Sequence, residues 1–203
     1  MRRCLYCDAP IQRETLYSWL IEEDPLCSDC RAKLPKQKKI TVLEGLPVET
    51  FYRYDDFFRG LLLQYKECYD EALKDVFLYR IREELKIRYA ACHILYVPST
   101  QRKRKERGFD HLKKIYAPLH LPEVRGLSLI EEKIQEGKGR TQRETMKENY
   151  RYEGEKHRKI LIVDDVMTTG SSMTGVYRAV KPYAESVKAV CLARVEKTIT
   201  LSK

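Results

Sequence analysis

The clearest pattern along the chain is a short apolar run that is followed at once by acidic and hydroxyl side chains. Residues 160–163 form an unbroken, mostly β-branched apolar run, which is typical of a strand buried on both faces of a parallel sheet. Asp164 and Asp165 come next, and then a turn rich in Thr, Gly and Ser. Residues 173–184 repeat apolar side chains at helical spacing. This order predicts a strand, a turn and a helix.

Other short apolar runs predict further strands of the same sheet. Residues 91–97 and 186–195 have the composition of buried parallel strands. Residues 51–54 alternate polar and apolar side chains, and together with residues 127–130 they could extend the sheet. Strands that alternate with helices indicate an α/β fold, here a doubly wound and mostly parallel sheet.

The longest helical pattern covers residues 58–86. It has no internal proline, Asp55 is positioned to cap its start, and a break is expected around residues 68–70. Its aromatic side chains are interpreted as core residues rather than as a platform for stacking bases.

The turn after residues 160–163 has the composition of an anion site at a helix N-terminus. Free backbone N–H groups and nearby hydroxyls can hold a phosphate there, and Gly170 lets the backbone come close to it. Two carboxylates would repel a bare phosphate. They suit a ligand that also carries a polyol, because Asp164 and Asp165 can accept hydrogen bonds from ribose hydroxyls, directly or around a divalent cation. The alternative, a plain Asp-capped turn, needs only one Asp and no hydroxyl cluster.

On these residues, the segment 160–172 resembles the phosphoribosyl pyrophosphate (PRPP) loop of type I phosphoribosyltransferases. The resemblance implies the sheet of that family, PRPP with Mg²⁺ as the ligand, and catalytic roles for Asp164 and Asp165 at the ribose hydroxyls. It implies phosphate binding by the residues that follow, which are Val166, Met167, Thr168, Thr169, Gly170, Ser171 and Ser172. It does not identify the acceptor base.

Length and charge narrow the class of protein. The chain has 203 residues, enough for one ordinary domain and a small module, with a formal net charge of +9. This positive charge could bind a nucleic acid or a polyphosphate ligand, or it could serve solubility alone. No stretch approaches the roughly 20 apolar residues of a membrane span, and the start has no apolar signal region. We therefore expect a cytoplasmic protein without membrane insertion.

The cysteines near the N-terminus have the spacing of a zinc site. Cys4 and Cys7 form one Cys-x-x-Cys pair, and Cys27 and Cys30 form another after 19 intervening residues. Disulfides are disfavoured in a reducing cytoplasm, and no βαβ pattern supports a redox pair. Four cysteine ligands leave no open position for catalysis, so the predicted zinc is structural. The expected division is residues 1–38 as zinc ribbon and basic linker, and residues 39–203 as the main domain.

A basic run follows the predicted strand at residues 91–97. Five of the six residues 102–107 are cationic, and they come directly after a small polar turn. The run could be a solvated helix end, but its place at the end of a sheet strand favours contact with an anion. That anion could be pyrophosphate, a nucleic-acid backbone, or each in turn. The candidate contacts are Ser99, Thr100, Arg102, Lys103, Arg104 and Arg107.

The basic run makes the family resemblance more specific. Val97-Pro98, the cations and Arg107-Gly108-Phe109, behind a four-cysteine ribbon, resemble the ComF/ComFC proteins of bacterial DNA uptake. The pair Tyr65-Lys66 resembles a further element of that family, whereas Asp110-His111 stands where Asn-Gln is usual. The resemblance implies a role in competence (natural transformation), single-stranded DNA as a partner, and contact with the helicase or ATPase of the uptake machinery.

Two classes of function remain open on the sequence. The first is a ComF-like binding protein that holds PRPP-Mg²⁺ and single-stranded DNA. The second is an active type I phosphoribosyltransferase, a pentosyl glycosyltransferase that joins a nucleobase or amine to PRPP and releases pyrophosphate. The polar, glycine-containing residues 137–149 could close over such a site or be an ordinary surface loop. Whether the protein is an enzyme is left undecided.

Overall fold

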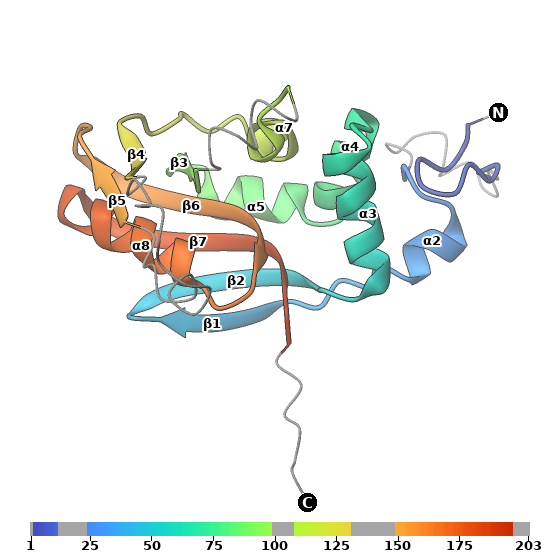
Figure 1. Ribbon diagram of the computed structural model, residues 1–203, viewed down its shortest axis with the longest axis horizontal. Helices are drawn as coiled ribbons and strands as arrows, with labels where there is room; N and C mark the ends of the chain where they lie inside the picture. The colour runs from blue at the N-terminus through green and yellow to red at the C-terminus, as the bar shows by residue number, and fades with distance from the viewer. Residues whose placement is uncertain (1, 12–23, 99–107, 131–148, 197–203) are drawn as a thin grey trace, which may run out of the picture.

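The computed structural model describes residues 2–11, 24–98, 108–130 and 149–196 (Figure 1). Its centre is a five-stranded sheet in the order β1-β2-β7-β6-β3. The strands are β1 (Lys39–Leu43), β2 (Leu46–Arg53), β7 (Ala184–Arg194), β6 (His157–Met167) and β3 (His93–Tyr96). The last four are parallel, and β1 pairs antiparallel with β2. The predicted mostly parallel α/β sheet is therefore confirmed.

The two longest strands, β6 and β7, lie inside the sheet because their sequences are apolar on both faces. Ile160 is 1% exposed and the three residues after it are fully buried. β6 extends beyond its predicted range at both ends, since it pairs with β7 from His157 to Met167, and β7 begins two residues earlier than predicted. The acidic pair therefore belongs to the end of a strand rather than to the turn after it.

Three helices follow β2, with a break where the sequence predicts one. They are α3 (Asp56–Glu67), α4 (Lys74–Leu78) and α5 (Arg82–Tyr89), and a short 3₁₀ turn, Glu71–Leu73, precedes α4. Tyr69 has a positive φ of 58°, which a continuing helix does not tolerate. Asp55 caps α3, as expected, because its Oδ1 accepts from the N–H of Phe58 at 3.0 Å.

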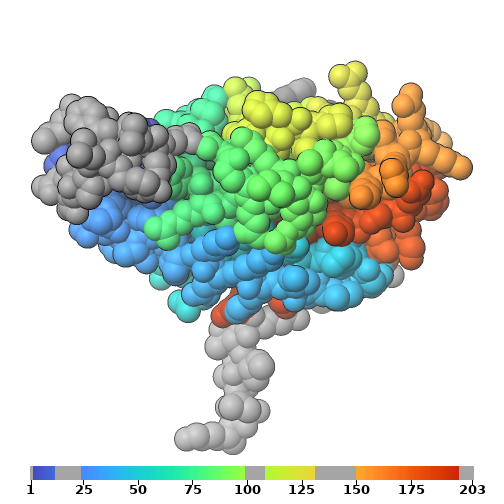
Figure 2. Space-filling view, turned by 180° about the vertical axis from the view of Figure 1, so that it is seen from behind, coloured from blue at the N-terminus to red at the C-terminus, as the bar shows by residue number. Residues whose placement is uncertain are grey.

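The helix predicted over residues 173–184 is shorter and begins earlier. α8 (Ser171–Val180) starts directly at the turn, and a 3₁₀ turn, Lys181–Tyr183, follows it. Pro182 lacks the N–H that a continuing helix needs, so the helix ends before it. Figure 1 shows α8 in front of the sheet, and in Figure 2, seen from behind, the green segment that includes α5 covers the opposite side.

Residues 127–130 do form a strand, but it does not extend the main sheet. β4 (Leu127–Ile130) pairs instead with β5 (Asn149–Tyr152) in a separate two-stranded sheet. The free side of β3 is occupied by the segment before β4, since Ile94 N–H donates to Pro122 and Val124 N–H donates to Ile94, both at 2.8 Å. The main sheet therefore has no edge left for β4 on that side.

Aromatic side chains of α3 and α4 fill the core, as predicted. Phe58, Tyr65 and Phe77 are fully buried and lie in contact as edge-on or tilted pairs. Cys92 and Cys191 are also buried, whereas Cys68 is exposed. Within the described residues, no helix has the length and apolarity needed to cross a membrane.

Candidate phosphoribosyl site and metal site

The turn between β6 and α8 presents hydroxyls at a helix N-terminus. Gly170 is the N-cap of α8 and supplies no side-chain oxygen to its first turn. Thr168, Thr169 and Ser171 are exposed, and the hydroxyls of Thr169 and Ser171 lie 2.8 Å apart. A helix N-terminus carries partial positive charge on its N–H groups, so this turn can hold an anion.

Gly170 has a conformation and a neighbour that exclude a larger residue. Its φ is +82°, in the left-handed region, and a Cβ built there would overlap Cδ1 of Leu43 at the end of β1. The chain after Leu43 is also fixed to α8, because Arg178 forms a two-point ion pair with Glu44, one of its hydrogen bonds being 2.7 Å. The β1–β2 hairpin therefore supports the turn from one side.

Replacing Gly170 by Ala is expected to lower the free energy of unfolding by about 1–2 kcal/mol, because the left-handed backbone and the Leu43 contact both disfavour a Cβ. The matched control is Gly45→Ala. Gly45 has a similar φ of +86°, but its added Cβ would meet only the Tyr177 hydroxyl at 3.9 Å. Urea denaturation of both variants separates the two causes. Equal losses at the two positions would show that Leu43 does not constrain the turn.

The two aspartates at the end of β6 have different surroundings. The backbone carbonyl of Asp164 accepts from the hydroxyl of Tyr116 at 2.9 Å, and its Oδ1 accepts from the N–H of Asp165 at 2.9 Å. Asp165 is only 7% exposed. Its Oδ2 lies 2.7 Å from Nε2 of His111 and forms an ion pair with Nζ of Lys66.

The partners of Asp165 decide its charge. Burial raises the pKa of the carboxyl, but the positive charge of Lys66 and the hydrogen bond of His111 outweigh burial and hold the pKa below its ordinary value. The carboxylate is therefore ionised at neutral pH although it is buried.

Lys66 and His111 were not among the residues that the sequence assigned to the site. Lys66 is in the last turn of α3 and His111 is the first residue of α7 (His111–Tyr116). They lie 99 and 54 residues before Asp165, and only the packing of α3 and α7 at the end of β6 brings the three together. A local motif could not have predicted the contact.

The predicted residues from Ser99 to Arg107 lie outside the described part of the chain, as do residues 131–148. Their last described neighbour, Pro98, follows β3 at the same edge of the sheet as Asp164. The N–H of Val97 donates to the carbonyl of Val163 at 3.1 Å, so the two strands end side by side. The structure thus brings together the residues from Asp164 to Ser172, and the contacts predicted for the basic run stay predictions.

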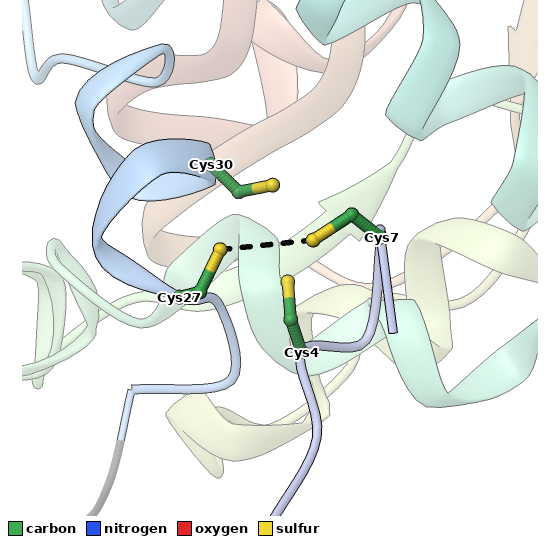
Figure 3. Close-up of side chains that lie close together, drawn as sticks. All are labelled: Cys4, Cys7, Cys27 and Cys30. Atoms are coloured by element: carbon green, nitrogen blue, oxygen red, sulfur yellow. Dashed lines mark hydrogen bonds between the residues drawn. The ribbon is translucent and has the colours of Figure 1, made fainter. Parts of the chain in front are cut away.

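The four N-terminal cysteines form one cluster (Figure 3). Cys4 and Cys7 come from the first segment of the chain, and Cys27 and Cys30 come from the start of α2 (Ser28–Ala32). Their four Sγ atoms lie within 4.8 Å of one another, and those of Cys7 and Cys27 are 3.7 Å apart. Sulfurs of a tetrahedral zinc site with bonds of about 2.3 Å are separated by about 3.8 Å. The cluster therefore fits a metal such as zinc.

The surroundings of the sulfurs favour a cation. Burial raises the pKa of the Cys4 thiol, but backbone N–H groups, first those of Cys7 and Cys27, outweigh burial and lower that pKa to about 7. Burial and the neighbouring sulfurs raise the pKa of Cys30, an effect that a bound divalent cation reverses. Thiolates, rather than thiols, are the form that binds metal.

A buried arginine joins the cysteine module to the rest of the chain. Arg31 is 4% exposed, donates to Asp24 through Nε at 2.6 Å, and lies over the ring of Tyr79 at 5.2 Å. Lys36 and Lys38 both form ion pairs with Glu84 of α5. The module therefore packs against the helices that follow β2, as Figure 1 shows for α2 beside α3.

Sequence comparison identifies the main domain. Residues 83–201 match the phosphoribosyl transferase domain family. Because this match spans more than half of the chain, the protein belongs to the phosphoribosyl transferase domain family. A comparison with curated protein sequences gave no significant match.

Three solved structures illustrate the similarity. A purine phosphoribosyltransferase from Pyrococcus horikoshii Ot3 is 16% identical, with 61% of this chain and 83% of that chain covered and a TM-score of 0.37. An orotate phosphoribosyltransferase from Aeropyrum pernix is 17% identical, with coverage of 82% and 78% and a TM-score of 0.38. An adenine phosphoribosyltransferase from Leishmania donovani is 14% identical, with coverage of 95% and 89% and a TM-score of 0.37.

Proposed function

We propose that the protein binds PRPP with Mg²⁺ at the end of β6 and acts as a ComF-like component of bacterial DNA uptake. One observation carries the first part. In a chain of the phosphoribosyl transferase domain family, an acidic pair and an exposed hydroxyl turn meet at the N-terminus of α8. An anion site beside carboxylates matches a ligand that has both a phosphate and a ribose.

In this proposal the turn from Thr168 to Ser172 holds the 5′-phosphate through its hydroxyls and the first N–H groups of α8. Asp164 and Asp165 accept hydrogen bonds from the ribose hydroxyls. Mg²⁺ would neutralise the pyrophosphate of the ligand. The N-terminal module, residues 1–38, would be a structural zinc ribbon in front of the binding domain, residues 39–203.

The proposed DNA-uptake role rests on the order of three features along the chain. A four-cysteine module and a phosphoribosyl domain that carries a basic run after β3 occur in the sequence order of the ComF/ComFC proteins. We infer a cytoplasmic protein whose basic run contacts single-stranded DNA and whose partners include the helicase or ATPase of the uptake machinery. The net charge of +9 is consistent with a polyanionic partner.

Ligand-dependent stabilisation tests PRPP binding. At a PRPP concentration of 100 times Kd, with Mg²⁺, the wild type is expected to gain about 2.7 kcal/mol against unfolding. The double variant Asp164→Asn/Asp165→Asn should lose most of this gain, and Asp75→Asn, which changes an exposed carboxylate on α4, should keep it. A wild type that gains nothing from PRPP would contradict the proposal.

A separate titration tests DNA binding. Neutralising Arg102, Lys103 and Arg104 to Gln should weaken binding of single-stranded DNA. It should also lower the slope of log K against log salt by about 2, since each lost phosphate contact contributes about 0.7. The Asp164→Asn/Asp165→Asn variant is the control and should bind DNA as the wild type does. An unchanged salt slope in the Gln variant would remove the basic run from the DNA site.

The second candidate function, an active phosphoribosyltransferase, is favoured by a cavity at the same edge of the sheet. A hollow of about 410 Å³ lies at the ends of β2 and β7 and is lined by residues that include Lys39, Arg53 and Arg194. Arg194 pairs in register with Met167 at the end of β6, so an acceptor placed there would be near the ribose. PRPP-dependent release of pyrophosphate with a panel of nucleobases and amines tests this candidate, and no release with any acceptor would exclude transfer to that panel.

A further inference from the structure

The buried contacts of Asp165 point to two residues that nothing above assigns to ligand binding. We propose that Lys66 and His111 are positioning residues, which fix the Asp165 carboxylate so that its other oxygen faces the ribose hydroxyls of the ligand. This inference rests on the proposed phosphoribosyl site and deepens it. It extends that site from the turn after β6 to α3 and α7.

Both residues act on the same oxygen. Oδ2 of Asp165 forms an ion pair with Nζ of Lys66 and lies 2.7 Å from Nε2 of His111. Among the described residues, the hydrogen bond of His111 and the ion pair of Lys66 with this carboxylate are both formed by Oδ2. A carboxylate that is held through one oxygen keeps the lone pairs of the other oxygen for a hydroxyl donor.

The three side chains are held rigidly enough to orient a ligand. The side chains of Lys66, His111 and Asp165 are 15%, 6% and 10% exposed. The hydroxyl of Tyr65, next to Lys66 on α3, donates to the backbone carbonyl of His111 at 3.0 Å. The ring of Phe109 packs on Tyr65 at 5.5 Å between centroids. Neighbouring residues of α3 therefore fix both the start of α7 and the aspartate of β6.

A purely structural role accounts less well for this arrangement. Removing two charges from water is costly, and apolar side chains of similar size often replace a buried ion pair without loss of stability. An ionised carboxylate held at the end of a strand, beside an anion-binding turn, is instead the arrangement that hydrogen-bonds a diol.

Two phosphate ligands separate positioning from folding. Ribose 5-phosphate engages both the turn and the aspartates, whereas inorganic phosphate engages the turn alone. In ³¹P NMR titrations, Lys66→Met and His111→Leu should each lower the affinity for ribose 5-phosphate at least tenfold. Both variants should bind inorganic phosphate with an affinity within twofold of that of the wild type. His111→Gln, which retains an N–H donor, should recover most of the affinity for ribose 5-phosphate. Lys86→Met on α5 is the control for loss of a lysine and should match the wild type.

Each result has one meaning. A wild type that binds neither ligand would overturn the proposed function and this inference with it. If the wild type binds both ligands, and the Lys66 and His111 variants lose affinity for both equally or for neither, the inference alone would be overturned. If Lys66→Met does not fold, the affinities of His111→Leu and His111→Gln for ribose 5-phosphate and for inorganic phosphate test the inference in the same way.

Discussion

Cys30→Ser is expected to abolish stoichiometric zinc binding and to unfold the N-terminal module, while the five-stranded sheet stays folded. The reason is the small size of the module, in which the metal rather than an apolar core supplies the folding free energy. Structural zinc contributes about 10–16 kcal/mol of apparent binding free energy in comparable small sites. Cys30 is buried, and its Sγ lies within 4.8 Å of the other three sulfurs, so serine cannot complete the tetrahedron.

Metal content per chain and limited proteolysis measure this prediction. The wild type should carry one zinc per chain and resist cleavage before residue 39, and the variant should do neither. Cys68→Ser is the matched control, because Cys68 is exposed and stands outside the cluster. One tightly bound zinc in the Cys30→Ser chain would contradict the four-thiolate site.

Lys66→Met is expected to lower the free energy of unfolding by about 3–5 kcal/mol at pH 7, because it leaves the buried Asp165 carboxylate without its cation. The pH dependence has a definite sign. The pKa of Asp165 is lowered in the folded wild type, so its contribution is present above the unfolded value of about 3.9 and is lost as the pH falls through the folded value.

In the variant, burial raises the pKa of Asp165 without opposition from the charge of Lys66, and only His111 still lowers it, so this pKa is higher than in the wild type. The folded variant therefore takes up its proton at a higher pH than the folded wild type does. The difference in free energy of unfolding between the two proteins should shrink as the pH falls from neutral into the acid range, as measured by urea denaturation. Acid release of zinc affects both chains alike and cancels in this difference. A difference that is constant with pH would show that Lys66 does not act through the Asp165 charge.

Features that depend on neighbouring residues in the sequence could be predicted. The apolar run at residues 160–163 predicted the buried strand, and the spacing of Cys4, Cys7, Cys27 and Cys30 predicted a cysteine cluster that the structure assembles. The capping of α3 by Asp55 was also local. In each case a few adjacent side chains determine the conformation.

Features that depend on tertiary packing could not be predicted. β1 was missed although residues 40–42 are β-branched. It is an edge strand that pairs only with β2, and its apolar residues Ile40 and Val42 are 62% and 66% exposed, so it belongs to the sheet through backbone pairing rather than through a buried face. β4 was assigned to the wrong sheet because the segment before it already occupies the edge of β3. Lys66 and His111 become neighbours of Asp165 only when two helices pack at the end of β6.

Calorimetric titration of the wild type with PRPP and Mg²⁺ tests the central claim most directly, with the Asp164→Asn/Asp165→Asn variant titrated in parallel. We predict one binding site per chain in the wild type and an affinity at least tenfold weaker in the variant, because the ribose hydroxyls then lose their carboxylate acceptors. The absence of heat in the wild type, or equal affinity in both proteins, would contradict a phosphoribosyl site at the end of β6.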